Sequence, residues 1–107
     1  MYEYQAKIIR VVDGDTVNVE IDLGFNINFT QPLRLHGINA PELSTDEGKV
    51  IRDILKQKIE GKIVTIQTIK DRKEKYGRYL ATLILPGFAP DINQWLVNEG
   101  YAVLYKG

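Results

Sequence analysis

The 107-residue sequence contains no cysteine, a single histidine and no long apolar run. The absence of cysteine excludes disulfides and thiolate metal sites, and one histidine leaves oxygen atoms as the main ligands of any metal, which favours calcium or magnesium. No stretch approaches the roughly 18 consecutive apolar residues of a transmembrane helix, and the start MYEYQAKIIRVVD lacks the basic and apolar blocks of a signal peptide. We therefore expect no membrane contact and a cytoplasmic chain, secreted only if a leader has been removed.

Net charge is also lacking, because fourteen basic residues balance fourteen acidic ones. A balanced chain does not offer the broad positive surface of a tight nucleic-acid binder. The segment KDRKEKYGR, residues 70–78, differs from the rest, with five basic and two acidic side chains. It is either a solvated loop or a place where a phosphate-bearing partner binds.

The hydrophobic pattern predicts mostly β structure. Residues 6–12 (AKIIRVV) and 16–21 (TVNVEI) are predicted strands, and Asp13 and Gly14 between them are a typical two-residue hairpin link. After Gly24 the alternation resumes in FNINF, residues 25–29, and a further strand is expected after Pro32. KIVTIQTI and RYLATLIL predict two more strands on either side of the charged segment.

Two helices are predicted between and after these strands. Ser44 and Glu47 form a capping-box pattern before apolar residues at helical spacing, which predicts a helix over about residues 45–60 that ends at Gly61. Pro90 and Asp91 are expected to start a short helix that carries Trp95 inward as a core residue, and YAVLY is then a short strand or extended segment.

Five strands with a helix between the third and the fourth is the element order of an OB-type barrel. The predicted fold class is mainly β with helices (α+β): a five-stranded OB-fold barrel with a short C-terminal helix. We expect residues 1–107 to form a single domain and a monomer.

Three polar clusters interrupt this regular pattern: DGDT at residues 13–16, RLHGINAPE at 34–42 and KYGR at 75–78. Together they contain the groups that phosphodiester hydrolysis needs, namely a base that deprotonates water, cations that balance charge on the phosphorus, and oxygen ligands for a metal. Arginine suits the second role because its planar guanidinium binds two phosphate oxygens and stays protonated. A surface ion pair between Arg34 and Glu42 is the simpler alternative for the middle cluster.

The motifs VVDGDT, RLHGINAPE, KYGRYLA and NQWLVNEGYA, in this order, resemble the staphylococcal nuclease (thermonuclease) family over nearly the whole chain. The resemblance implies an OB-fold, calcium-dependent nuclease that acts on DNA and/or RNA and leaves 3′-phosphate and 5′-hydroxyl ends. It implies catalytic roles for three residues, with Arg34 and Arg78 as the phosphate-binding arginines and Glu42 as the general base.

The resemblance also implies residues for the metal and the substrate. It assigns Asp15 and the backbone carbonyl of Ala40 to a single calcium ion, Asp13 to a supporting position, and Lys75 and Tyr76 to substrate contacts. Asn39 stands where the family usually places a second calcium-binding aspartate. An amide oxygen can still bind calcium, but one negative charge is missing, so we expect weak calcium binding.

A second functional hypothesis comes from a different class: a non-catalytic nuclease-like OB module that binds nucleic acid or protein. Asn39 and the zero net charge favour this module, whereas the joint presence of Arg34, Glu42 and Arg78 favours the nuclease.

Overall fold

The computed structural model of the protein describes residues 2–73 and 77–106. Within these ranges the elements follow one another in the order β1 (Tyr2–Asp13), β2 (Thr16–Asp22), β3 (Asn28–Leu35), β4 (Ile38–Asn39), α1 (Asp46–Ile59), β5 (Ile63–Lys73), β6 (Tyr79–Ile84), α2 (Ile92–Asn98) and β7 (Val103–Leu104).

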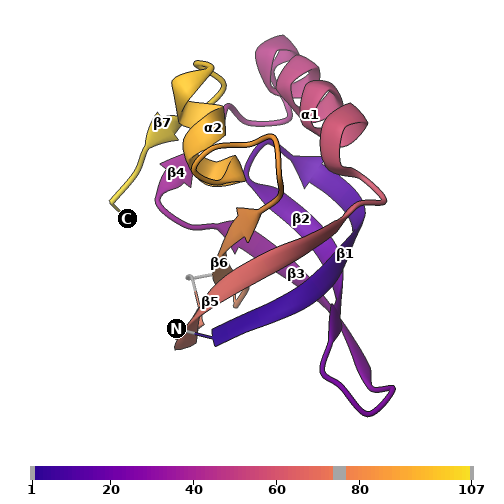
Figure 1. Ribbon diagram of the computed structural model, residues 1–107. Helices are drawn as coiled ribbons and strands as arrows, with labels where there is room; N and C mark the ends of the chain where they lie inside the picture. Colours follow the sequence, from indigo (N-terminus) through magenta and orange to yellow (C-terminus); the bar gives the residue numbers. More distant parts are fainter. Residues whose placement is uncertain (1, 74–76, 107) are drawn as a thin grey trace.

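Five of the strands close into a barrel in the order β1-β2-β3-β6-β5 (Figure 1). The β3–β6 pair is parallel and the other barrel pairs are antiparallel. The two short strands β4 and β7 pair with each other outside the barrel. The predicted α+β fold is therefore confirmed: a five-stranded OB-type barrel with a helix between its third and fourth strands and a short helix near the C-terminus.

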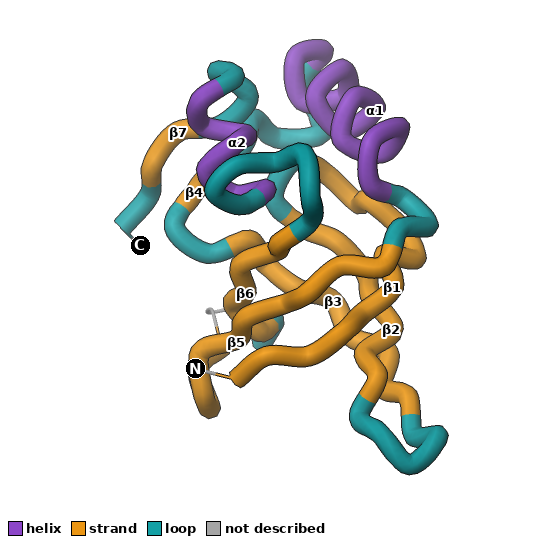
Figure 2. Tube along the Cα trace, viewed as in Figure 1, coloured by secondary structure: helices purple, strands orange, loops and turns teal. Residues whose placement is uncertain are grey.

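The core fills the barrel and the space beneath the helices, which lie together at one end of it (Figure 2). Val17 and Val19 are fully buried because alternate side chains of β2 point into the barrel. Leu55 of α1 and Leu96 of α2 are equally buried against it. Trp95 packs edge-to-face against Phe88 and Tyr101 beside the core, which agrees with its predicted core role.

The first hairpin differs in detail from its prediction. Its two-residue link is Gly14 and Asp15, not Asp13 and Gly14, because Asp13 still pairs with Thr16 at the end of β1. The Asp13 carboxylate accepts a hydrogen bond from the Asp15 N–H at 3.0 Å and so closes the turn. Asp13 therefore stabilises the turn through its carboxylate, and Asp15 is one of the two turn residues.

The third strand begins earlier than the start predicted after Pro32. β3 begins at Asn28 and runs through Pro32 without a break, paired with β2 over Asn28–Arg34. The connection between the two strands extends away from the end of the barrel opposite the helices (Figure 1). Phe25, at its tip, has a positive φ of 54° and is 96% exposed. The alternation of residues 25–29 therefore belongs to an exposed hairpin and not to a core face.

Two element boundaries also differ. The N-cap of α1 is Thr45, whose hydroxyl accepts the Gly48 N–H at 3.0 Å, and not Ser44. β5 continues to Lys73, so the first residues of the charged segment lie in a strand instead of a loop. In the described part of the chain, neither helix has the length and apolar character needed to span a membrane.

Candidate active site around Asp15

A tight turn carries Asp15 into the molecule. A Cβ atom on Gly14 would lie 2.7 Å from the Cβ of Ala40 and 3.0 Å from the Cγ2 of Ile51. Only glycine lets the turn come this close to the start of the β4–α1 connection and to α1. The close approach leaves Asp15 only 8% exposed.

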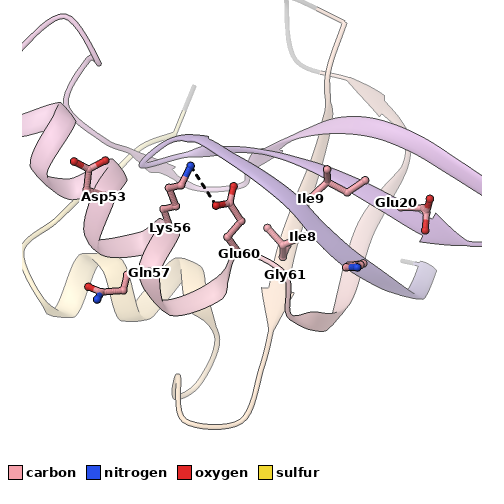
Figure 3. Close-up of a pocket in the computed structure, with 9 residues that line it drawn as sticks. Ile8, Ile9, Glu20, Asp53, Lys56, Gln57, Glu60 and Gly61 are labelled. Carbon is pink, nitrogen blue, oxygen red and sulfur yellow. Dashed lines mark ion pairs between the residues drawn. The ribbon is translucent and has the colours of Figure 1, made fainter.

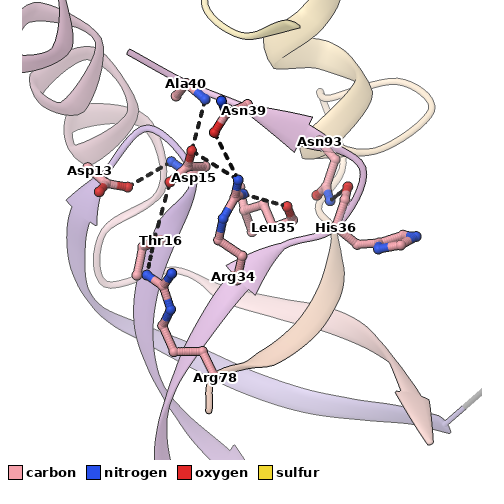
Figure 4. A network of polar contacts seen from close by, with 10 residues as sticks. All are labelled: Asp13, Asp15, Thr16, Arg34, Leu35, His36, Asn39, Ala40, Arg78 and Asn93. Carbon is pink, nitrogen blue, oxygen red and sulfur yellow. Dashed lines mark hydrogen bonds and ion pairs between the residues drawn. The ribbon is translucent and has the colours of Figure 1, made fainter. Parts of the chain in front are cut away.

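The Asp15 carboxylate is the centre of a polar network (Figure 4). Its Oδ2 accepts the Ala40 N–H at 2.8 Å and lies 3.4 Å from Nη2 of Arg34. Its Oδ1 accepts a hydrogen bond from the Thr16 hydroxyl at 3.3 Å. One carboxylate thus joins the first hairpin to β3 and to the segment after β4.

Arg34 lies beside this carboxylate with both terminal nitrogens engaged. Nη1 donates to the backbone carbonyl of Leu35 at 2.9 Å, and Nη2 donates to Oδ1 of Asn39 at 3.1 Å. Because β3 pairs Arg34 with Thr16 across the sheet, the arginine is placed next to the Asp15 turn. These contacts hold the guanidinium in a defined orientation.

The second arginine reaches the same network from another strand. Arg78 directly precedes β6, and its Nη1 donates to the Thr16 hydroxyl at 3.0 Å. The structure therefore brings together five predicted site residues and one supporting residue, which the sequence separates by up to 65 positions: Asp13, Asp15, Arg34, Asn39, Ala40 and Arg78 (Figure 4).

The pKa of Asp15 is set mainly by its burial. Burial is the main cause that raises the pKa of Asp15 from its ordinary 3.8 to about 6, and the nearby Asp13 raises it further. The Ala40 N–H and the charge of Arg34 lower the pKa, but they do not offset burial. The charged form of this carboxylate is therefore destabilised by burial despite the nearby arginine.

The oxygen atoms of Asp15 and Asn39 have the chemistry that a calcium site needs. Both residues direct an oxygen at the same atom, Nη2 of Arg34, so their oxygens already converge on positive charge. These two residues contribute a single formal negative charge, and the described ranges contain no group of three or more acidic, histidine or cysteine side chains placed to hold a metal. Calcium takes about six to eight oxygen ligands, so a calcium site at these two residues stays a prediction. Ala40 contacts Asp15 through its N–H, and the metal-binding role of its carbonyl stays a prediction.

Glu42 lies near the network in sequence, but its carboxylate is not part of it. The residue is exposed, and its backbone carbonyl accepts hydrogen bonds from the N–H and the hydroxyl of Thr45. Between the two described residues Arg34 and Glu42 there is no ion pair, since Arg34 pairs with Asp15 instead. The simple Arg34–Glu42 pair is therefore not formed, and the Glu42 carboxylate is open to solvent.

Two residues that sequence reasoning missed support this arrangement. Thr16 links Arg78 to Asp15, and its position directly after DGD was the available signal. Gly48 lets α1 pack on the Glu42 turn, since a Cβ there would lie 2.0 Å from the Glu42 carbonyl oxygen. A glycine inside a predicted helix was its signal. Lys75 and Tyr76, the predicted substrate contacts, lie outside the described residues.

A separate hollow of about 840 Å³ lies between the C-terminal half of α1 and strands β1 and β2 (Figure 3). Lys56 and Glu60 line the hollow on the α1 side and form an ion pair at 3.2 Å. Glu20 of β2 lines the opposite side. None of the residues around Asp15 lines it. We place the candidate site at the Asp15 network, because the chemically suited groups converge there and not in this hollow.

The family of the chain follows from comparison with known proteins. Residues 32–107 match the family model of staphylococcal nuclease homologues, and this segment contains Arg34, Asn39, Glu42 and Arg78. The chain belongs to this family, as its motifs predicted.

Individual relatives extend the match to almost the whole chain. A protein of Escherichia coli O157:H7 named as an uncharacterized endonuclease is 32% identical over 97% of this chain and 63% of its own length. The thermonuclease of Staphylococcus hyicus is 33% identical over 94% of the chain and 59% of its own length. The endonuclease YhcR of Bacillus subtilis is 33% identical over 96% of the chain and 9% of its own length. The chain thus spans less than two thirds of these relatives.

Proposed function

We propose that this protein is a nuclease that hydrolyses phosphodiester bonds in DNA and/or RNA. The observation that carries the proposal is the placement of two arginines at one buried carboxylate, Arg34 directly and Arg78 through the Thr16 hydroxyl, in a chain of the staphylococcal nuclease family. Two arginines fixed at one place provide a rigid receptor for a phosphate group. The names of two relatives, a thermonuclease and an endonuclease, support the same activity.

In the proposed reaction the two arginines bind the non-bridging oxygens of the scissile phosphate. They stabilise the negative charge that grows on these oxygens as the phosphorus becomes pentacoordinate. Glu42, whose carboxylate is open to solvent, takes the proton of the attacking water. The bond from phosphorus to the 5′ oxygen then breaks, and the leaving oxygen takes a proton from solvent, which gives the 3′-phosphate and 5′-hydroxyl ends that the family resemblance implies.

We further propose that calcium is the cofactor and that Asp15, Asn39 and the carbonyl of Ala40 hold it. When bound, the ion would add positive charge beside the scissile phosphate. The convergence of one oxygen each from Asp15 and Asn39 on Nη2 of Arg34 supports a cation-binding role for these two residues. With one carboxylate in this set, calcium binding is expected to be weak.

The test is cleavage of single-stranded DNA at mildly alkaline pH, with calcium varied from micromolar levels to about 10 mM. We expect cleavage that requires calcium, stops with a chelator and is lost in Glu42→Gln. Glu47→Gln, an exposed glutamate of the first turn of α1, is the matched control and should retain activity.

Two results would contradict the proposal. If the folded protein cleaves neither DNA nor RNA at any calcium level, the nuclease assignment fails and the non-catalytic binding module replaces it. If Glu42→Gln cleaves as fast as the unchanged protein, Glu42 is not the base.

A further inference from the structure

The Thr16 hydroxyl lies between the guanidinium group of Arg78 and the carboxylate of Asp15. Arg78 donates to it through Nη1 at 3.0 Å, and it donates in turn to Oδ1 of Asp15 at 3.3 Å (Figure 4). A guanidinium can only donate hydrogen bonds and an ionised carboxylate can only accept them. The directions are therefore fixed, with the hydroxyl oxygen facing Arg78 and the hydroxyl proton facing Asp15.

The strand itself does not require this hydroxyl. Thr16 is the first residue of β2, where its backbone pairs with Asp13 on one side and Arg34 on the other. It is only 4% exposed, although strand alternation places it on the face opposite the barrel-facing Val17 and Val19. A valine has the same branched shape and suits a buried strand position at least as well. The hydroxyl of Thr16 therefore has its explanation in its two polar contacts.

The two arginines reach Asp15 by different routes. Arg34 lies directly beside the carboxylate at 3.4 Å, whereas Arg78 is joined to it through Thr16. A hydroxyl that donates to a carboxylate becomes a stronger acceptor, so the negative charge of Asp15 strengthens the bond to Arg78. Without the hydroxyl, this link between Arg78 and the Asp15 turn would be absent.

We propose that Thr16 is a positioning residue for Arg78, which orients the guanidinium for phosphate binding by coupling it to the Asp15 carboxylate. The catalytic consequence rests on the proposed nuclease function, whereas the orientation of Arg78 does not. Thr16 contacts no reacting atom in this scheme and acts only through the arginine. Positioning of this kind affects the transition state more than substrate binding, because the phosphate oxygens gain charge as the reaction proceeds.

The activity test compares Thr16→Val with Thr16→Ser. The valine variant should lose roughly tenfold in kcat, as expected for one charge-assisted hydrogen bond, with a smaller change in KM. The serine variant, which keeps the hydroxyl, should recover most of the rate. In an Arg78→Ala background, Thr16→Val should have no further effect. An equal loss in that background, or no loss in the valine variant, would overturn the proposal.

The matched control is Thr65→Val. Thr65 lies on β5, and its hydroxyl accepts a hydrogen bond from Gln5, away from Asp15 and Arg78. This variant should leave kcat unchanged. Thermal unfolding of all variants would separate a loss of rate from a loss of fold.

A second measurement does not depend on activity. Proton–nitrogen NMR of the guanidinium groups, assigned with Arg78→Ala, reports how freely the Arg78 group rotates. Rotation should be hindered in the unchanged protein and in Thr16→Ser, and faster in Thr16→Val. Unchanged rotation in Thr16→Val would overturn the positioning role even if the protein is a nuclease. Faster rotation in a protein that cleaves nothing would support the positioning role and refute only the nuclease function.

Discussion

Asp15 is the residue on which the charge balance of the site depends. Burial raises its pKa to about 6 in the folded protein, from an ordinary value of 3.8. Because the folded-state pKa is the higher one, the folded protein binds this proton more tightly than the unfolded chain does. The free energy of unfolding should therefore fall as the pH rises from about 4 to about 6, by on the order of 2 kcal/mol, and the Asp15 contribution should stay constant above that range.

The comparison with Asp15→Asn isolates this contribution from the other carboxylates. The asparagine does not titrate, so the stability of the variant relative to the unchanged protein should rise between pH values of about 4 and 6. Urea unfolding at several pH values measures the difference. A difference that does not vary with pH would show that Asp15 has an ordinary pKa.

Asn39 is one of the proposed calcium ligands of the same site. Its Oδ1 faces Nη2 of Arg34 at 3.1 Å, close to the Asp15 carboxylate. Asn39→Asp would add a negative charge to a cluster in which burial already outweighs Arg34, so calcium affinity should rise by about ten- to a hundredfold. Calorimetric titration with calcium measures the change. Asn26→Asp, the same substitution at the hairpin tip, should leave the affinity as it is, and equal affinities in all three proteins would refute the proposed ligand role.

Close packing at the start of α1 fixes the position of the Glu42 backbone. Gly48 is buried in the first turn of the helix, and a Cβ atom there would lie 2.0 Å from the carbonyl oxygen and 2.6 Å from the carbonyl carbon of Glu42. These atoms belong to the backbone, so Gly48→Ala must displace either the helix or the turn. We expect a loss of about 2–4 kcal/mol in the free energy of unfolding.

The same displacement should reduce cleavage beyond what unfolding explains, because it moves the proposed base. The rate of Gly48→Ala should be measured at a temperature where the variant remains folded. Lys49→Ala, an exposed neighbour on the same helix, is the matched control. Full activity in a folded Gly48→Ala protein would show that the Glu42 turn tolerates the shift.

The elements that hydrophobic periodicity defines were predictable, and those that depend on tertiary contact were not. The alternation in β2 and the helical spacing of Ile51, Leu55 and Ile59 follow from burial, and the structure buries these residues, whereas Val50 of the same apolar pattern is 57% exposed. The hairpin at Phe25 has a similar alternation but extends past the barrel, where no core lies opposite it. Periodicity reports that a face is apolar, whereas its burial depends on what the fold places there.

The candidate site was predictable to a similar extent. The order of the motifs identified the family, which the comparisons confirm, and the barrel then brought Asp15, Arg34 and Arg78 to one place. The ion-pair partner of Arg34 was not predictable. Arg34 pairs with Asp15, although Glu42 is nearer to it in the sequence. Thr16 was overlooked since a threonine at a strand start has an ordinary structural explanation.

The 107-residue chain has no net charge, so we expect any affinity for nucleic acid to come from a few local contacts. Each phosphate contact made to a single strand lowers the logarithm of the binding constant by about 0.7 per tenfold rise in salt concentration. Contacts from Arg34, Arg78 and Lys75 would give a total slope of about −2. A slope much steeper than this would require a wider basic surface than these three residues supply.

The substrate contact proposed for Lys75 needs its own test, because this lysine lies in the basic segment 70–78 and outside the described residues. Binding of single-stranded DNA to the Glu42→Gln protein, without cleavage, should be measured over a range of salt concentrations. Lys75→Ala should reduce the slope by about 0.7 if the lysine contacts a phosphate, while Lys106→Ala near the C-terminus should leave it unchanged. An unchanged slope in Lys75→Ala would remove this lysine from the substrate contacts and leave the two arginines of the Asp15 network as the proposed phosphate-binding groups.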